Sequence, residues 1–215
     1  MPYGPLKLIA GPAFRLYCRP RVTGLEHLPA TGPALLASNH LGTIDPIILP
    51  ALMPRRVTFV AKSEYFADGK LTGKLLRALG QLPVERRASS AATAALDAAL
   101  DVLRAGEVFG IYPEGTRSPD GRLYRGKVGV GWLALASGAP VIPVGMIGSD
   151  KVLPRGSVLP RPVRVEIRLG APVPVSGDPS SPKDRRAATD QIMDAIAALT
   201  GQERVAGYAP TEKRS

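Results

Sequence analysis

Short apolar runs alternate along this chain with longer amphipathic segments. The short runs are rich in valine, isoleucine and leucine and are bounded by glycine, proline or polar residues, which is typical of buried strands. The longer segments repeat apolar residues every three or four positions, which is typical of a helix with one buried face. The pattern predicts strands at 34–38, 57–61, 82–84, 108–112, 141–145 and 163–169, and helices at 46–53, 71–79, 89–105, 126–136 and from 181 onward.

This order of strands and helices predicts a single layered α/β domain with a mixed, mostly parallel sheet and flanking helices. The chain has no obvious linker or internal repeat, so the domain is expected to cover residues 21–205. Pro143 lies inside the strand predicted at 141–145. Because proline has no backbone N–H, this strand is expected at an edge of the sheet or at a bulge. Residues 206–215 are polar and are expected to form a disordered tail.

Residues 1–20 combine apolar residues with several cations, and two interpretations of them stay open. One is an amphipathic, membrane-associating segment whose apolar side chains face lipid while its arginines lie near headgroups. The other is a helix packed on the domain. Lys7 and Arg15 make the segment too charged to span a membrane. The uncharged stretch 128–149 is long enough to span one, but turn residues at 137–140 divide it into a helix and a strand.

Composition narrows the classes of function. Lysine and arginine number 28 against 18 acidic residues, a formal charge of +10 that suits an anionic membrane surface, acyl-CoA or nucleic acid. Aromatic residues are only 5% and no nucleic-acid fold motif is present, so a base-stacking surface is not expected. Cys18 is the single cysteine, which excludes an internal disulfide and fits a reducing compartment. One cysteine and two histidines cannot form a structural zinc site.

Residues 38–46, Ser-Asn-His-Leu-Gly-Thr-Ile-Asp-Pro, are the most informative stretch of the chain. They place His40 and Asp45 five positions apart, at the point where a predicted buried strand ends. A neutral imidazole can take a proton from an alcohol, and a nearby carboxylate can orient it and stabilise the imidazolium. A structural interpretation is also open. Asp45 followed by Pro46 is typical of a helix N-cap and first helical position, which would leave His40 as a loop histidine.

A second stretch with candidate functional residues follows the strand predicted at 108–112. The turn after it contains proline and glycine and carries Glu114, Thr116 and Arg117 to the carboxyl end of that strand. Arginine binds phosphate through two parallel N–H groups, and glycine allows backbone to approach a ligand closely. The alternative is a surface turn with a solvated arginine.

Four motifs, in this order, resemble those of the glycerolipid acyltransferase family, which includes the bacterial 1-acylglycerol-3-phosphate acyltransferases. Residues 39–45 follow the pattern N-H-x-S-x-x-D, except that Gly42 stands where the family has serine. Residues 80–86 follow G-x-x-(F/P)-(I/V)-x-R, and residues 112–118 follow (F/Y)-P-E-G-T-R-S without a gap. Residues 141–144 follow V-I-P-V. The His-Asp spacing is weak by itself, but the ordered set is specific.

The resemblance covers roughly residues 20–170 and implies a role for each matched residue. His40 would be the general base that deprotonates the acceptor hydroxyl, and Asp45 would orient it. The hydroxyl belongs to the substrate, so no enzyme nucleophile is needed. The implied substrate-binding residues are Arg117 with Gly115 and Thr116 for the acceptor's phosphate, Arg86 as a second phosphate cation, Lys62 as a substrate-site lysine or a solvated loop charge, and Glu114, which either sets the turn or contacts substrate.

What the resemblance implies is an O-acyltransferase that uses no cofactor or metal. Its donor would be acyl-CoA or acyl-carrier protein, and its acceptor lysophosphatidate, giving phosphatidate in phospholipid biosynthesis. It would act at the cytoplasmic face of the cell membrane as a peripheral or monotopic protein on an anionic lipid surface. Two alternatives stay open: an acyltransferase for a different lysolipid or polar lipid, and a non-catalytic membrane-binding protein with the same fold.

Overall fold

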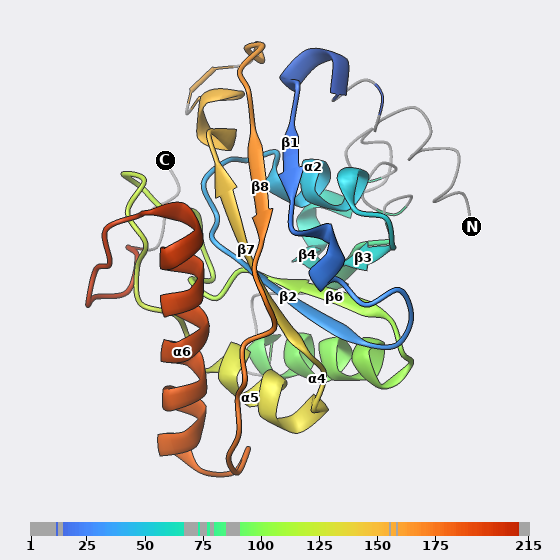
Figure 1. The fold of residues 1–215 in the computed structure, drawn as a ribbon, viewed down its shortest axis with the longest axis vertical. Helices are drawn as coiled ribbons and strands as arrows, with labels where there is room; N and C mark the ends of the chain where they lie inside the picture. The colour runs from blue at the N-terminus through green and yellow to red at the C-terminus, as the bar shows by residue number, and fades with distance from the viewer. Residues whose placement is uncertain are drawn as a thin grey trace.

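A six-stranded sheet forms the centre of the molecule (Figure 1) in the order β1-β8-β7-β2-β6-β3. The computed structural model describes residues 12, 15–66, 73, 77, 80–84, 91–154, 156–157 and 159–210. All neighbouring strands are parallel except β7 and β8, which confirms the mixed, mostly parallel sheet. The strands are β1 (Arg21–Thr23), β2 (Ala34–Ser38), β3 (Val57–Thr58), β6 (Val108–Ile111), β7 (Val141–Ile147) and β8 (Glu166–Leu169).

The helices follow the predicted segments closely. They are α2 (Asp45–Leu52), α4 (Ala91–Arg104), α5 (Gly129–Ser137) and α6 (Pro182–Thr200), with the short 3₁₀ helices η1 (Leu25–His27), η2 (Ser63–Phe66) and η3 (Ser149–Lys151). The Ser181 hydroxyl caps α6 by accepting from the Asp184 N–H, as a serine before a proline predicts. Among the residues that the structure describes, no helix is both long and apolar enough to cross a membrane.

Helices cover both faces of the sheet, so the domain has three layers. Every residue of β2 is buried, and successive side chains point to opposite faces. Ala34 and Leu36 pack with α2 on one face, whereas Leu35 and Ala37 pack with α4, α5 and α6 on the other. Burial on both faces explains why β2 is an uninterrupted apolar run rather than an alternating one.

The strand predicted at 57–61 is divided at Phe59. Its first part is β3 of the central sheet, and its second part, β4 (Val60–Lys62), pairs in parallel with β5 (Leu82–Val84) in a separate two-stranded sheet. The Phe59 N–H donates to the buried Gln81 side chain at 2.8 Å instead of to a strand. The Phe59 ring fills the space above Gly110, where a Cβ would lie 2.2 Å from it. This packing turns the chain out of the first sheet.

The expected edge position of the strand that contains Pro143 is wrong, because β7 lies between β2 and β8 near the middle of the sheet. The reason is the register of β8. Its antiparallel pairing with β7 runs from Val144 to Ile147, so the ladder begins one residue after Pro143. No N–H is required of Pro143 there, while its carbonyl still accepts from the Gly170 N–H at 2.9 Å.

Parallel pairing of β2 with both β6 and β7 brings the carboxyl ends of these three strands to one edge of the sheet. This is the edge at which open α/β sheets bind ligands. The helix predicted at 71–79 falls almost entirely outside the described residues, and so does the predicted start of the next helix at residue 89. The short strand β1 was not predicted, because its three residues are too few to show a periodic pattern.

Candidate active site

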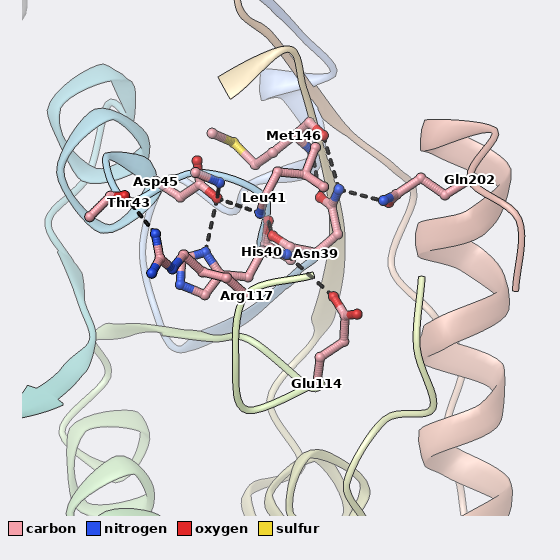
Figure 2. Close-up of polar contacts among 11 residues, drawn as sticks. Asn39, His40, Leu41, Thr43, Asp45, Glu114, Arg117, Met146 and Gln202 are labelled. Carbon is pink, nitrogen blue, oxygen red and sulfur yellow. Dashed lines mark hydrogen bonds and ion pairs between the residues drawn. The ribbon is translucent and has the colours of Figure 1, made fainter. Parts of the chain in front are cut away.

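The loop after β2 begins at a fully buried Asn39 that fixes it to β7 (Figure 2). The Asn39 amide donates to the Met146 carbonyl at 2.9 Å and accepts from the Met146 N–H at 2.7 Å. Its Nδ2 also donates to the Gln202 side chain at 2.8 Å, just after α6. One side chain therefore holds the start of the loop against two other elements, so the next residue, His40, has a fixed position.

His40 and Asp45 lie within hydrogen-bond distance, with 2.9 Å between Nδ1 and Oδ2 (Figure 2). Asp45 is fully buried, and the same Oδ2 accepts from the N–H groups of Leu41 and Gly42, both at 2.8 Å. Three donors on one oxygen fix the direction of the carboxylate. With Nδ1 on Asp45, Nε2 is the ring nitrogen that can accept a proton from a substrate, and the side chain of His40 keeps 14% of its surface exposed.

The interpretation of Asp45 as a helix N-cap is wrong. Helix α2 begins at Asp45 itself, and Ile44 occupies the capping position without a side-chain cap. An N-cap carboxylate would accept from N–H groups inside the first turn of the helix. This carboxylate turns back to the loop that carries His40, so its hydrogen bonds serve the histidine and not the helix.

Tyr112 is a site residue to which the sequence assigned no role. Its ring stacks on the His40 imidazole with 4.1 Å between centroids, and the Phe59 ring stacks behind it at 5.0 Å. Burial, and to a lesser degree the charge of Asp45, raise the pKa of Tyr112 well above its ordinary value. The phenol is therefore neutral, and its ring holds the plane of the imidazole. Tyr112 is the first residue of its motif, but the contact depends on the pairing of β2 with β6 and could not be predicted locally.

Glu114 is a buried carboxylate that joins two loops. Its Oε2 accepts from the Tyr124 N–H at 2.9 Å, and its Oε1 accepts a long bond of 3.4 Å from the His40 N–H. Burial raises the pKa of Glu114 to about 7, against the two backbone hydrogen bonds, which lower it. Of the two roles that the sequence left open, these contacts support the one in which Glu114 sets the turn.

The turn after β6 places its cation beside the loop of His40. Arg117 donates from Nη1 to the Thr43 hydroxyl at 2.7 Å (Figure 2). Gly115 has a φ of +71°, which favours glycine, and its N–H donates to the Tyr112 carbonyl. A Cβ on Gly115 would lie 3.0 Å from the Lys127 Nζ. Lys127 is thus a second cation at this turn, nine positions beyond the motif that ends at residue 118, and the sequence did not single it out as a site residue.

Two predicted site residues are not placed. Arg86 lies outside the described residues, as does the side chain of Lys62. The backbone of Lys62 ends β4, paired with Val84 of β5. Thr116 lies in the same turn as Arg117 and is partly buried. In the described part of the chain no group of histidine, cysteine, aspartate and glutamate side chains is arranged to hold a metal ion.

An apolar groove of about 1060 Å³ reaches the loop that carries His40 and Asp45. Ile44, the residue before Asp45, forms part of its wall. Two guanidinium groups, Arg19 and Arg164, interrupt an otherwise mostly apolar lining. The other residues that line the groove are Leu16, Tyr17, Cys18, Val152, Leu153, Pro160 and Pro162.

Residues 19–147 match the family model described as Acyltransferase. The chain is 31% identical over 152 residues to the chloroplastic 1-acyl-sn-glycerol-3-phosphate acyltransferase LPAT1 of Arabidopsis thaliana, covering 70% of this chain and 42% of the relative. It is 29% identical over 177 residues to the 1-acyl-sn-glycerol-3-phosphate acyltransferase of Bacillus subtilis, covering 81% of this chain and 84% of the relative. The chain thus spans less than half the length of its plant chloroplast relatives.

A solved structure shares the fold. The crystal structure of the 1-acyl-sn-glycerophosphate acyltransferase PlsC from Thermotoga maritima matches with a TM-score of 0.71 and 27% sequence identity. The match covers 92% of this chain and 79% of the other.

Proposed function

This chain belongs to the acyltransferase family, and we propose that it transfers a fatty acyl group from a thioester donor to the free hydroxyl of lysophosphatidate, giving phosphatidate. The relatives named as 1-acyl-sn-glycerol-3-phosphate acyltransferases support this acceptor. The observation that carries the proposal is the hydrogen-bonded pair of the partly exposed His40 and the buried Asp45, at the edge of the sheet where its parallel strands end.

The pair can activate an alcohol directly. His40 Nε2 takes the proton of the acceptor hydroxyl while that oxygen attacks the thioester carbonyl carbon, and Asp45 stabilises the imidazolium that forms. A new C–O bond forms and the C–S bond breaks. The proton on His40 then passes to the leaving thiolate, so the products are an ester and a free thiol, and the histidine is neutral again.

Cations at the turn after β6 suit an acceptor that carries phosphate. The Arg117 guanidinium reaches Thr43 in the loop of His40, so both ends of the acceptor can be held near one loop. Arginine binds phosphate through a planar pair of N–H groups. Lys127 supports the same charge preference from beside Gly115. We assign Arg86 as a second cation for the phosphate and Lys62 as a substrate-site lysine, as the resemblance to the family implies.

The apolar groove at Ile44 suits the fatty chain of either substrate. It begins beside the catalytic loop and is walled largely by aliphatic and proline side chains. Burying a methylene contributes about 0.8 kcal/mol, so a groove of this kind can hold an acyl chain without any polar contact. The groove is compatible with either donor, acyl-CoA or acyl-carrier protein, because it would hold only the fatty chain.

We further propose that the protein works on an anionic membrane surface, with residues 1–20 as the membrane-associating segment. The net charge of +10 favours such a surface. At the described end of that segment Leu16 and Tyr17 are exposed, at 83% and 40%. The Tyr17 hydroxyl donates to the Pro160 carbonyl at 2.6 Å, which places the segment beside a second exposed leucine, Leu159.

The acceptor is tested by product analysis with purified protein in detergent micelles. Palmitoyl-CoA is supplied with lysophosphatidate, lysophosphatidylcholine, lysophosphatidylglycerol or glycerol 3-phosphate, and the lipid products are identified by mass spectrometry. The proposal predicts phosphatidate from lysophosphatidate and little product from the others. Preferential acylation of a lysolipid with a different headgroup would replace the proposed acceptor. The same panel with acyl-carrier protein as donor identifies the thioester.

A further inference from the structure

One oxygen of the Asp45 carboxylate makes no hydrogen bond. Asp45 Oδ2 accepts three hydrogen bonds, but Oδ1 is buried and has no hydrogen-bond partner. Leaving a buried acceptor of a charged group unpaired is costly, and native proteins rarely do so without a functional reason. A donor for Oδ1 would also resist rotation of the carboxylate, which sets the hydrogen bond to His40.

A buried hydroxyl without a partner lies nearby. Ser149 is fully buried, and its Oγ has no hydrogen-bond partner either. It is the first residue of η3, directly after β7 and the turn at Gly148, whose φ is +78°. Its own backbone therefore belongs to the edge of the sheet that carries the catalytic pair, and it reaches that edge from a segment about a hundred residues away in sequence.

Gly42 places the two groups side by side. A Cβ built on Gly42 would lie 3.1 Å from Asp45 Oδ1 and 2.6 Å from the Ser149 carbonyl oxygen. The backbone of Ser149 and the unpaired oxygen of Asp45 thus meet at one point, beside the only residue type that leaves room for both. Gly42 stands where the family motif has serine, so the hydroxyl that the motif brings from position 42 is missing here.

We propose that Ser149 is a positioning residue for the reaction proposed above, and that its hydroxyl donates to Asp45 Oδ1. A serine hydroxyl turns about χ1 between staggered positions and its proton rotates freely, so it can serve an acceptor beside its own backbone. Held at both oxygens, the Asp45 carboxylate keeps Oδ2 aimed at His40 Nδ1. Gly42 and Ser149 together replace the serine of the motif.

Tyr112 is the other buried hydroxyl near the pair without a hydrogen-bond partner. The structure favours Ser149, because the Tyr112 ring is committed to stacking on His40. No contact places its hydroxyl at Oδ1, whereas the position of Gly42 Cβ ties Ser149 to that oxygen. Comparing variants of the two hydroxyls separates the possibilities.

The test combines kinetics with nitrogen NMR on full-length protein labelled with ¹⁵N-histidine. The chain has two histidines, so His27 serves as an internal reference for the Nδ1 signal of His40. Ser149→Ala is expected to lower kcat about tenfold, the size expected for a lost hydrogen bond to a charged group, with KM for both substrates unchanged. The Nδ1 signal of His40 should move towards that of His27 as the Nδ1 contact loosens.

Matched variants make the outcome decisive. Ser149→Cys, whose thiol is somewhat larger than the hydroxyl and donates only weakly, should lie between wild type and Ser149→Ala on both readouts. Thr189→Ala removes another fully buried hydroxyl, in α6, and should change neither. An unchanged kcat and Nδ1 signal in Ser149→Ala would overturn the proposal, as would the effect appearing in Tyr112→Phe instead. The NMR readout holds even if lysophosphatidate is not the acceptor, so the two proposals fail separately.

Discussion

Gly42 shows how one small residue can be required by packing against backbone. Its Cβ position is occupied by the Ser149 carbonyl, with the oxygen at 2.6 Å and the carbon at 2.8 Å. Backbone cannot move aside like a flexible side chain. The departure from the family serine is therefore built into the position of η3, and the loop of His40 and η3 have to be considered together.

Restoring the family serine should harm this protein. Gly42→Ser is expected to cost about 1–3 kcal/mol of unfolding free energy, because it overpacks a site closed by backbone. It should also lower kcat, because the loop that donates to Asp45 must shift. Thermal unfolding and acyl-transfer rates check this, with Gly207→Ser as a control at a glycine in open space whose φ is not positive. A Gly42→Ser variant as stable and active as wild type would show that the backbone of η3 can shift to make room for the side chain.

Arg117 should act on binding more than on chemistry. Arg117→Ala is expected to raise KM for lysophosphatidate by about tenfold or more, since a bidentate contact to phosphate is lost, while KM for the thioester stays unchanged. Arg117→Lys should recover only part of the affinity for lysophosphatidate, because an ammonium group lacks the planar pair of N–H donors of a guanidinium group. Steady-state kinetics with each substrate varied in turn checks this. An unchanged KM for the acceptor would remove Arg117 from the phosphate site.

The secondary-structure elements form the site through the loops that follow three parallel strands, which are held to one another by buried side chains. Asn39 after β2 holds β7, and Glu114 after β6 holds the loop of His40 and the segment at Tyr124. A buried carboxyl whose pKa is raised to about 7 is an unusual way to join two loops. It makes the junction sensitive to pH near neutrality.

The Glu114 junction predicts a pH dependence of stability. The unfolded chain releases the Glu114 proton near pH 4.5, whereas the folded protein holds it up to about pH 7. The folded state therefore binds more protons in this window, and the contribution of Glu114 to the unfolding free energy falls as pH rises through it. The difference in unfolding free energy between wild type and Glu114→Gln, measured by urea titration, should fall from pH 4.5 to pH 7.

Glu166 provides a control for which the opposite pH dependence is expected. Its hydrogen bond with Arg168 lowers the pKa of Glu166, so its contribution is lost as pH falls. The difference between wild type and Glu166→Gln should accordingly rise with pH. A flat difference for Glu114→Gln would mean that the carboxyl is not held protonated in the folded protein.

Local pattern predicted most elements, and it failed where the answer depended on a neighbour. The strand at 34–38 and the start of the last helix at residue 181 carry their own signals, and both were predicted correctly. The division at Phe59 depends on Gln81 and Gly110, and the place of Pro143 depends on where β8 begins its pairing. None of these can be deduced from the segment itself.

The same limit applies to the site. His40, Asp45 and Arg117 belong to contiguous motifs, so the sequence could point to them, although their proposed roles stay predictions. Tyr112, Lys127 and Ser149 act through contacts made by other strands and turns. Only the assembled sheet edge brings them to the loop of His40.

For the whole molecule, exposed apolar side chains and positive charge point to lipid. Leu16 and Leu159, at 83% and 74% exposed, come from distant parts of the chain, and the contact of Tyr17 with Pro160 joins their segments. The apolar groove opens among the same segments. A membrane contact there would let a fatty chain pass from the bilayer to the loop of His40 without crossing water.

Replacing both leucines should weaken membrane binding. Leu16→Ser with Leu159→Ser is expected to reduce co-sedimentation with vesicles of phosphatidylglycerol and phosphatidylcholine several-fold, because each buried leucine contributes about 1.5–3 kcal/mol. Leu25→Ser, at a leucine 37% exposed in η1, is the control. Salt should weaken binding of both proteins through screening of the arginines. Equal binding by the double variant and the control would move the membrane contact elsewhere.

The proposed role of His40 as the base of an acyl transfer can be tested directly, because the two histidines of the chain allow a matched comparison. Release of free thiol from palmitoyl-CoA is measured with and without lysophosphatidate for wild type, His40→Ala and His27→Ala. We predict release that requires the acceptor, a loss of about 10²–10⁴-fold in His40→Ala, and near wild-type rates in His27→Ala. Acceptor-dependent release that survives in a folded His40→Ala protein would contradict the account.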